Sequence, residues 1–121
     1  MELTFGSFIT TRRKQQEIQM KDFAAELSFT PVYICDIEKS RRPAPAPHVL
    51  EKMVKLLHLT DEDKYLFYDL AAHTRKGVSV DLTDYIMENN PVRSALRKAK
   101  ELNATDQDWW EFIESLKEKY Q

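Results

Sequence analysis

The chain has 121 residues, of which 42% are hydrophobic and 31% charged, a composition typical of one folded domain or of one small domain with an extension. Two glycines and one cysteine exclude a glycine-rich phosphate loop and an intrachain disulfide. The formal charge is −2, but residues 1–60 carry nine lysines and arginines against seven acids, whereas residues 61–121 carry nine against thirteen. A polyanion, if one binds, is therefore expected to meet the first half.

No targeting or membrane segment is evident in the sequence. A basic start followed by an apolar run is missing at the N-terminus, and no stretch approaches the roughly 18 apolar residues of a membrane span. The single cysteine fits a reducing compartment. We therefore expect a cytoplasmic protein that binds no membrane.

Apolar periodicity predicts helices along nearly the whole chain, and hence an all-α fold. In the first half we expect helices over 4–16, 20–27, 31–40 and 48–58. The third has the clearest start, with Thr30 as N-cap and Pro31 at the first helical position. Only Ser28 and Phe29 separate the second helix from the third, so the chain must bend sharply. The proline-rich segment 41–47 is expected to be a stiff, non-helical connector.

In the second half we expect a helix over 61–73 capped by Thr60, a loop over 74–80, a helix over 81–89, a helix opened by Pro91 with Asn90 as its cap, and a final helix capped by Thr105. The final helix carries an apolar stripe, namely Trp109, Phe112, Ile113, Leu116 and Tyr120. We expect most of this stripe to pack against the two preceding helices. Adjacent tryptophans point about 100° apart on a helix, so either Trp109 or Trp110 is available to a partner.

Residues 5–60 resemble the helix-turn-helix domain of the phage lambda repressor and Cro type, the XRE family. The matching segments are Phe5-Gly6-x-x-Ile9-x-x-x-Arg13, Phe23-Ala24-x-x-Leu27 and Tyr33-Ile34-x-x-Ile37-Glu38-x-x-x-Arg42. The resemblance implies a five-helix helix-turn-helix domain over 1–73 and a C-terminal helical extension over 74–121 that dimerises or regulates. It also implies a sequence-specific DNA-binding regulator, and a dimeric repressor of phage or mobile-element type is the leading interpretation.

The resemblance implies a role for individual residues as well. Arg13 and Glu38 would pair as a scaffold between the first and third helices, and the exposed face of the third helix would read DNA. The implied DNA-binding residues are Lys21, Thr30, Pro31, Val32, Tyr33, Asp36, Lys39, Arg41 and Arg42. Val32 and Pro31 would touch thymine methyl groups, Asp36 would accept from a cytosine amino group, and the cations would contact phosphates.

Three positions depart from the usual family pattern. Met20 stands where a glutamine usually contacts DNA, and Ser28 and Ser40 stand where glycines usually end a helix. These departures leave open a helix-turn-helix domain that binds a protein instead of DNA, such as a phage-encoded inhibitor. The antitoxin of a toxin–antitoxin operon, which would bind both its operator and a toxin, is a further alternative.

The expected partners are double-stranded DNA, a second copy of the chain and a possible regulatory protein. The leading dimer interface consists of Trp109, Trp110, Ile113 and Leu116, and the segment 65–68 is the second choice. The three histidines and Cys35 lack the spacing of metal ligands, and no catalytic arrangement of side chains stands out. We therefore expect no enzymatic activity, no metal and no other cofactor.

Overall fold

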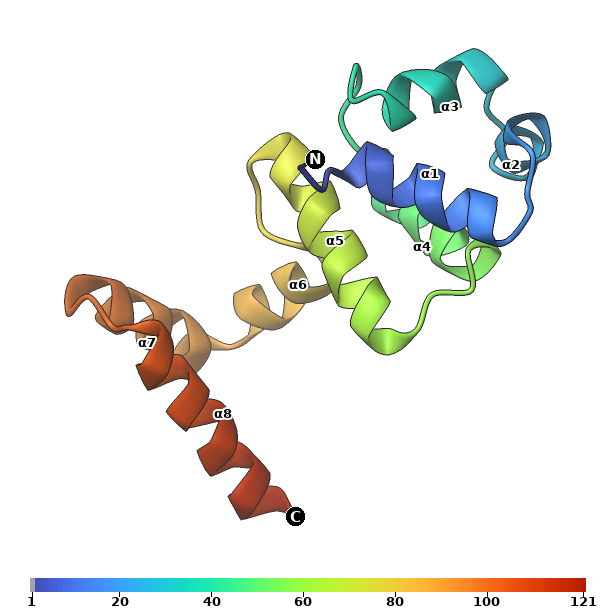
Figure 1. The fold of residues 1–121 in the computed structure, drawn as a ribbon. Coiled ribbons are helices and arrows are strands. Elements are labelled where there is room, and N and C mark those ends of the chain that lie inside the picture. The colour runs from blue at the N-terminus through green and yellow to red at the C-terminus, as the bar shows by residue number, and fades with distance from the viewer. Residues whose placement is uncertain (1) are drawn as a thin grey trace. The chain divides into compact units, whose positions relative to one another are not determined.

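The computed structural model describes residues 2–121, and over this range the backbone forms eight helices and no strand (Figure 1). The helices are α1 (Phe5–Gln15), α2 (Met20–Glu26), α3 (Pro31–Glu38), α4 (Pro47–Leu56), α5 (Asp61–Arg75), α6 (Val80–Glu88), α7 (Asn90–Glu101) and α8 (Asp106–Tyr120). The predicted all-α fold is therefore confirmed. The chain divides into two compact units, one ending at Thr83 and the other beginning at Asp84, which we call unit 1 and unit 2.

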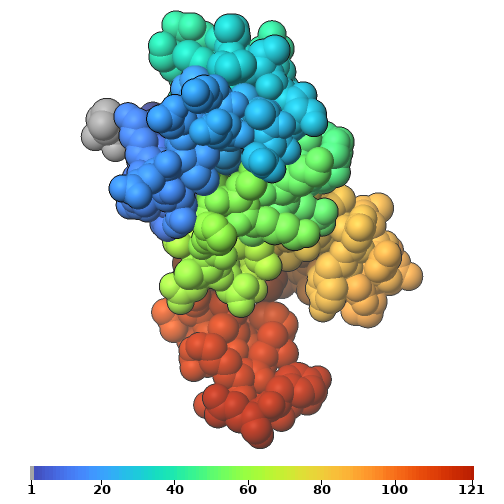
Figure 2. Space-filling model, turned by 90° about the vertical axis from the view of Figure 1, so that its right-hand side faces the viewer, coloured from blue at the N-terminus to red at the C-terminus, as the bar shows by residue number. Residues whose placement is uncertain are grey.

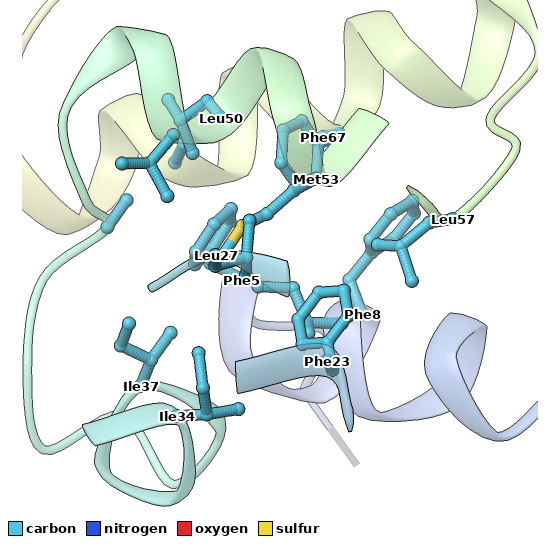
Figure 3. Packing of buried hydrophobic residues seen from close by; sticks show 14 of the residues in the cluster. Phe5, Phe8, Phe23, Leu27, Ile34, Ile37, Leu50, Met53, Leu57 and Phe67 are labelled. Atoms are coloured by element: carbon cyan, nitrogen blue, oxygen red, sulfur yellow. The ribbon is translucent and has the colours of Figure 1, made fainter. Parts of the chain in front are cut away.

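Helices α1 to α5 of unit 1 enclose a single hydrophobic core. Phe67 of α5 lies at its centre, with the ring of Phe5 at a centroid distance of 5.2 Å and that of Phe8 at 6.0 Å. Figure 3 shows side chains from the other helices converging on the same space. The buried apolar residues are Phe5, Phe8, Ile9, Phe23, Ala24, Leu27, Ile34, Ile37, Ala44, Val49, Leu50, Met53, Leu57, Phe67, Tyr68 and Ala71. Each helix of unit 1 up to α5 contributes an apolar face to this core, as the periodicity predicts.

Four helices begin at a threonine whose side chain accepts a hydrogen bond from the third helical amide. Thr30, Thr60 and Thr105 do so as predicted, and Thr4, expected to be the first residue of its helix, is instead the N-cap of α1. Thr105 and Asp108 form a reciprocal capping box.

Thr60 and Asp63 form only half of a reciprocal capping box. The Asp63 amide donates to Thr60 Oγ1 at 3.2 Å, but the Asp63 carboxylate accepts instead from both terminal nitrogens of Arg12 at 2.8 and 2.9 Å. Hydrogen bonding to the Arg12 guanidinium lowers the pKa of Asp63. The carboxylate thus serves to join α5 to α1.

Six helices of the described chain end in a residue with left-handed backbone, and none of these residues is glycine. They are Glu17, Ser28, Ser40, His58, Lys76 and Asn103, with φ between 51° and 61°. After each one, the next amide donates back to a carbonyl five residues earlier, as from Phe29 to Ala24 at 2.8 Å and from Arg41 to Asp36 at 2.8 Å. Ser28 and Ser40 therefore adopt the conformation usually given to glycine, at a cost of roughly 1–2 kcal/mol each.

The proline-rich connector and the end of α5 differ from the prediction. Pro47 opens α4 and is not part of the connector, because proline fits the first helical turn. Helix α5 continues past residue 73 to Arg75, where its last turn holds the connector. The Ala44 amide donates to Thr74 Oγ1 at 2.8 Å, and the Ala44 carbonyl accepts from Arg75 Nε at 2.9 Å. Both polar backbone groups of Ala44 are thereby satisfied while its side chain is buried.

Helix starts in the second half also shift. Helix α6 begins at Val80, one residue earlier than expected, and α7 begins at Asn90 with Asn89 as its N-cap. Asn89 provides no side-chain capping bond to α7, because its amide nitrogen donates to the Tyr85 carbonyl at 2.7 Å instead.

Unit 2 has no buried core. None of the described residues from 84 onward is buried, and the prediction that the stripe of the last helix packs away from solvent is wrong. Trp109 is 36% exposed, Phe112 51% and Leu116 40%. The physical reason is that a pair of helices covers only the line along which they touch, and no further layer of unit 2 closes over them.

A substitution at Gly6 tests how closely α1 packs on α3. A Cβ atom at this position would lie 2.3 Å from the Glu38 carbonyl oxygen and 2.6 Å from that of Ile37, so Gly6→Ala should lower the free energy of unfolding by about 1–3 kcal/mol. At Gly77 a Cβ atom would have no neighbour within 4 Å, so Gly77→Ala is the matched control and should be neutral or slightly stabilising. Urea denaturation of both variants measures this, and equal stabilities would contradict it.

Candidate nucleic-acid interface

Helices α2 and α3 form a helix-turn-helix in which only residues 27–30 connect the two helices. Leu27 caps α2, and Ser28 reverses the chain with φ 61°. Ala24 of α2 is fully buried, and its methyl group is small enough to let the two helices approach closely. This local arrangement sets α3 crosswise to α2 (Figure 1).

Helix α3 has one buried side and one exposed side. Ile34 is fully buried and Ile37 is 1% exposed, and Figure 3 shows both pointing into the core. The opposite side starts with Pro31 and Val32, both exposed, and Val32 shows 70% of its surface. In Figure 2 the residues of α2 and α3, light blue to cyan, occupy one end of unit 1. The candidate recognition face is therefore open to a partner.

A buried ion pair fixes α3 from behind. Arg13 of α1 donates from Nε to Glu38 Oε2 at 2.8 Å and from Nη2 to Glu38 Oε1 at 3.1 Å. The two side chains are only 9% and 5% exposed. Arg13 also donates to the Ile18 carbonyl, and Thr10 Oγ1 lies 2.9 Å from Glu38 Oε1. Both charges are thus paired and hydrogen-bonded, as a buried pair requires.

The candidate DNA contacts divide into exposed and half-buried groups. Lys21, Thr30, Lys39, Arg41 and Arg42 are exposed with Pro31 and Val32, whereas Tyr33 and Asp36 are half-buried. All of them belong to α2, α3 or the turns that follow each helix. The structure therefore brings the candidate residues to one region of unit 1.

The pairing of charges near the end of α3 is not apparent from the sequence. The Asp36 carboxylate lies 3.6 Å from Arg41 and 3.5 Å from Arg42. The Arg42 guanidinium also lies 4.9 Å from the centroid of the Tyr33 ring, which in turn lies 4.4 Å from that of Phe29. Separations of five and six residues are not helical neighbours, so no periodicity signals these pairs. The left-handed turn at Ser40 brings the arginines back over α3.

The helix-turn-helix surface has little net charge. Besides the Arg13–Glu38 pair, its ionisable residues on α2, α3 and the segment after α3 are Lys21, Lys39, Arg41 and Arg42 against Asp22, Glu26 and Asp36, a net charge of +1. Long-range attraction of a polyanion is therefore weak, and close contacts must supply most of any affinity.

Neither a metal-binding cluster nor a membrane-spanning helix is found among residues 2–121. No group of three or more histidine, cysteine, aspartate or glutamate side chains in this range is placed to hold a metal ion. None of the helices in the same range has the length and apolar character needed to cross a bilayer.

Comparison of the sequence with protein-family models finds no match, and comparison with curated proteins finds none either. Among solved structures, a complex of a SinR protein with a SinI protein is similar to this chain, with 18% sequence identity and a TM-score of 0.49. The similarity covers 98% of this chain and 100% of the other.

The ion pair behind α3 is testable by removing one member. Arg13→Ala leaves the Glu38 carboxylate buried without its main partner, so the free energy of unfolding should fall by about 3–5 kcal/mol. Replacing both residues by methionine removes both charges and should cost less than Arg13→Ala. Chemical denaturation measures both variants. A loss below about 1 kcal/mol for Arg13→Ala would show that the pair does not hold α3.

Proposed function

We propose that this protein is a sequence-specific DNA-binding transcriptional regulator that places α3 in the major groove. One observation carries the proposal. One side of α3 is exposed, and its last residue, Glu38, is anchored to α1 by the buried ion pair with Arg13. A helix used as a probe must keep one orientation while its outer side chains stay free. The major groove, about 12 Å wide, accepts such a helix.

Each part of the interface has a proposed role. Val32 and Pro31, at the exposed start of α3, contact thymine methyl groups, and Thr30 and Tyr33 lie beside them. The cations Lys21, Lys39, Arg41 and Arg42 contact phosphates and set the register of α3 on the duplex. Because operators of helix-turn-helix proteins are commonly two-fold, the proposed regulator acts as a dimer. The resemblance to the lambda repressor and Cro type favours a repressor of phage or mobile-element type.

The test is DNA binding as a function of salt concentration. The full chain is used to select sequences from a random duplex pool, and the affinity for the enriched sequence is then measured at several salt concentrations. Arg41→Ala and Arg42→Ala should each reduce the slope of log K against log salt by about 0.9, the value for one lost phosphate contact. The affinity should fall for all sequences alike, because phosphate contacts carry no base information.

Lys55→Ala is the matched control for this experiment. Lys55 is an exposed cation of α4, outside the helix-turn-helix, so its removal changes the net charge equally but should leave the slope unchanged. Failure to enrich any sequence, or equal slopes for all three variants and the parent chain, would refute DNA binding through α3.

A second candidate function is a protein-interaction module, as an inhibitor or an antitoxin would require. The observation that favours it is the pairing of Arg41 and Arg42 with Asp36, which reduces the positive charge offered to phosphates. The same pairing favours a positioning role for Asp36 over the cytosine contact suggested by the sequence.

Asp36→Asn separates these interpretations because it removes the charge and preserves the shape. If Asp36 only positions the arginines, binding to every duplex at low salt should tighten about twofold to fivefold with unchanged base preference. A change confined to one base pair would instead assign Asp36 to base readout. Absence of DNA binding in both the parent chain and the variant would favour the protein-interaction module.

A further inference from the structure

The outer face of α3 is poor in side chains that form specific hydrogen bonds with bases. Guanine is read by arginine or lysine and adenine by asparagine or glutamine, each through two hydrogen bonds. Residues 30–38, which are the N-cap and the whole of α3, contain none of these four residue types. Lys39 follows the last helical residue, whereas helix-turn-helix proteins contact base edges with the first residues of the recognition helix. Helix α3 therefore has no side chain for reading a purine in this way.

The polar side chains at the outer side of α3 are already engaged. Asp36, whose carboxylate could accept from a cytosine amino group, lies 3.6 Å from Arg41 and 3.5 Å from Arg42. The Arg42 guanidinium also lies 4.9 Å from the centroid of the Tyr33 ring. Thr30 Oγ1 accepts from the Tyr33 amide at 3.1 Å, and a hydroxyl bonds to donors and acceptors alike, so it discriminates little between bases.

The start of the outer face of α3 is apolar. Pro31, Val32 and Cys35 are neighbours on the helix surface, because side chains three and four positions apart lie side by side. Pro31 and Val32 are exposed, and Cys35 is half-buried. Val32 is 70% exposed, more than any other large apolar side chain described in unit 1. Its isopropyl group is thus the most prominent feature that α3 offers to the major groove.

A face of this kind distinguishes base pairs by their methyl groups. Thymine presents a methyl group at C5 in the major groove, and cytosine carries the same group at the same position once it is methylated. We propose that α3 reads C5-methyl groups, so that 5-methylcytosine is bound as thymine is and more tightly than cytosine. The inference rests on the proposed function and extends it, because it makes the affinity for an operator sensitive to cytosine methylation.

The first test removes single methyl groups from the duplex. The full chain enriches its operator from a random pool, and each thymine is then replaced in turn by deoxyuridine, which lacks only the C5-methyl group. At a thymine that contacts Val32, the replacement should raise the dissociation constant about fourfold, the factor that corresponds to one buried methyl group. For Val32→Ala the same replacement should change the dissociation constant by less than about twofold, because the contact is already lost.

Val78→Ala is the matched control for this experiment. Val78 is a valine of unit 1 that lies outside the helix-turn-helix and is 58% exposed, so its truncation removes the same atoms from a comparable position. The Val78→Ala chain should keep the response of about fourfold to deoxyuridine. Loss of the response in this variant too would show that the effect does not come from α3.

The second test adds a methyl group. The thymine that responds to deoxyuridine is replaced by cytosine and, in another duplex, by 5-methylcytosine, with guanine opposite in both. The parent chain should bind the methylated duplex about fourfold more tightly, and Val32→Ala should bind the two alike.

The outcomes separate this inference from the proposed function. An operator in which no thymine responds to deoxyuridine, a response that Val32→Ala does not reduce, or equal binding of the two cytosine duplexes by the parent chain would overturn the inference and leave DNA binding standing. Failure to enrich any duplex would overturn both.

Discussion

The buried ion pair between Arg13 and Glu38 fixes the direction in which α3 points. Glu38 is the last residue of α3, and its carboxylate is held by two nitrogens of an arginine on α1. The absence of a side chain at Gly6 lets the backbones of α1 and α3 come close enough for this contact. Because an unpaired charge at this depth is costly, the pair favours one arrangement of the two helices. The exposed face of α3 therefore also has a fixed orientation.

Helix α5 contacts α1, the hydrophobic core and the segment that follows α3. At its start Asp63 binds Arg12 of α1, in its middle Phe67 fills the core, and at its end Thr74 and Arg75 bind the backbone of Ala44. The segment after α3 is therefore fastened on both sides, by the ion pairs of Asp36 and by the end of α5. The arginines proposed to contact DNA stand on an anchored segment.

The two units use their apolar side chains in opposite ways. Unit 1 buries five aromatic residues in one core, and unit 2 leaves the aromatic residues of α8 exposed beside a groove. The same contrast bears on the two dimer contacts that the sequence suggests. In segment 65–68, Phe67 and Tyr68 belong to the core and only Tyr65 and Leu66 remain exposed, whereas Trp109, Trp110, Ile113 and Leu116 all remain accessible. The α8 surface is thus the larger unsatisfied apolar area.

The sequence by itself determined the order of the helices and the starts of those capped by Thr30, Thr60 and Thr105, because apolar spacing and threonine caps act between residues at most a few positions apart. The family resemblance supplied the Arg13–Glu38 pair. Only the tertiary structure decided which distant charged residues form ion pairs and which apolar helix faces remain exposed to solvent. Arg12 and Asp63 are 51 residues apart, and Asp36 meets its arginines through a left-handed turn made without glycine. Burial of α8 depends on whether another layer covers it, which no local pattern encodes.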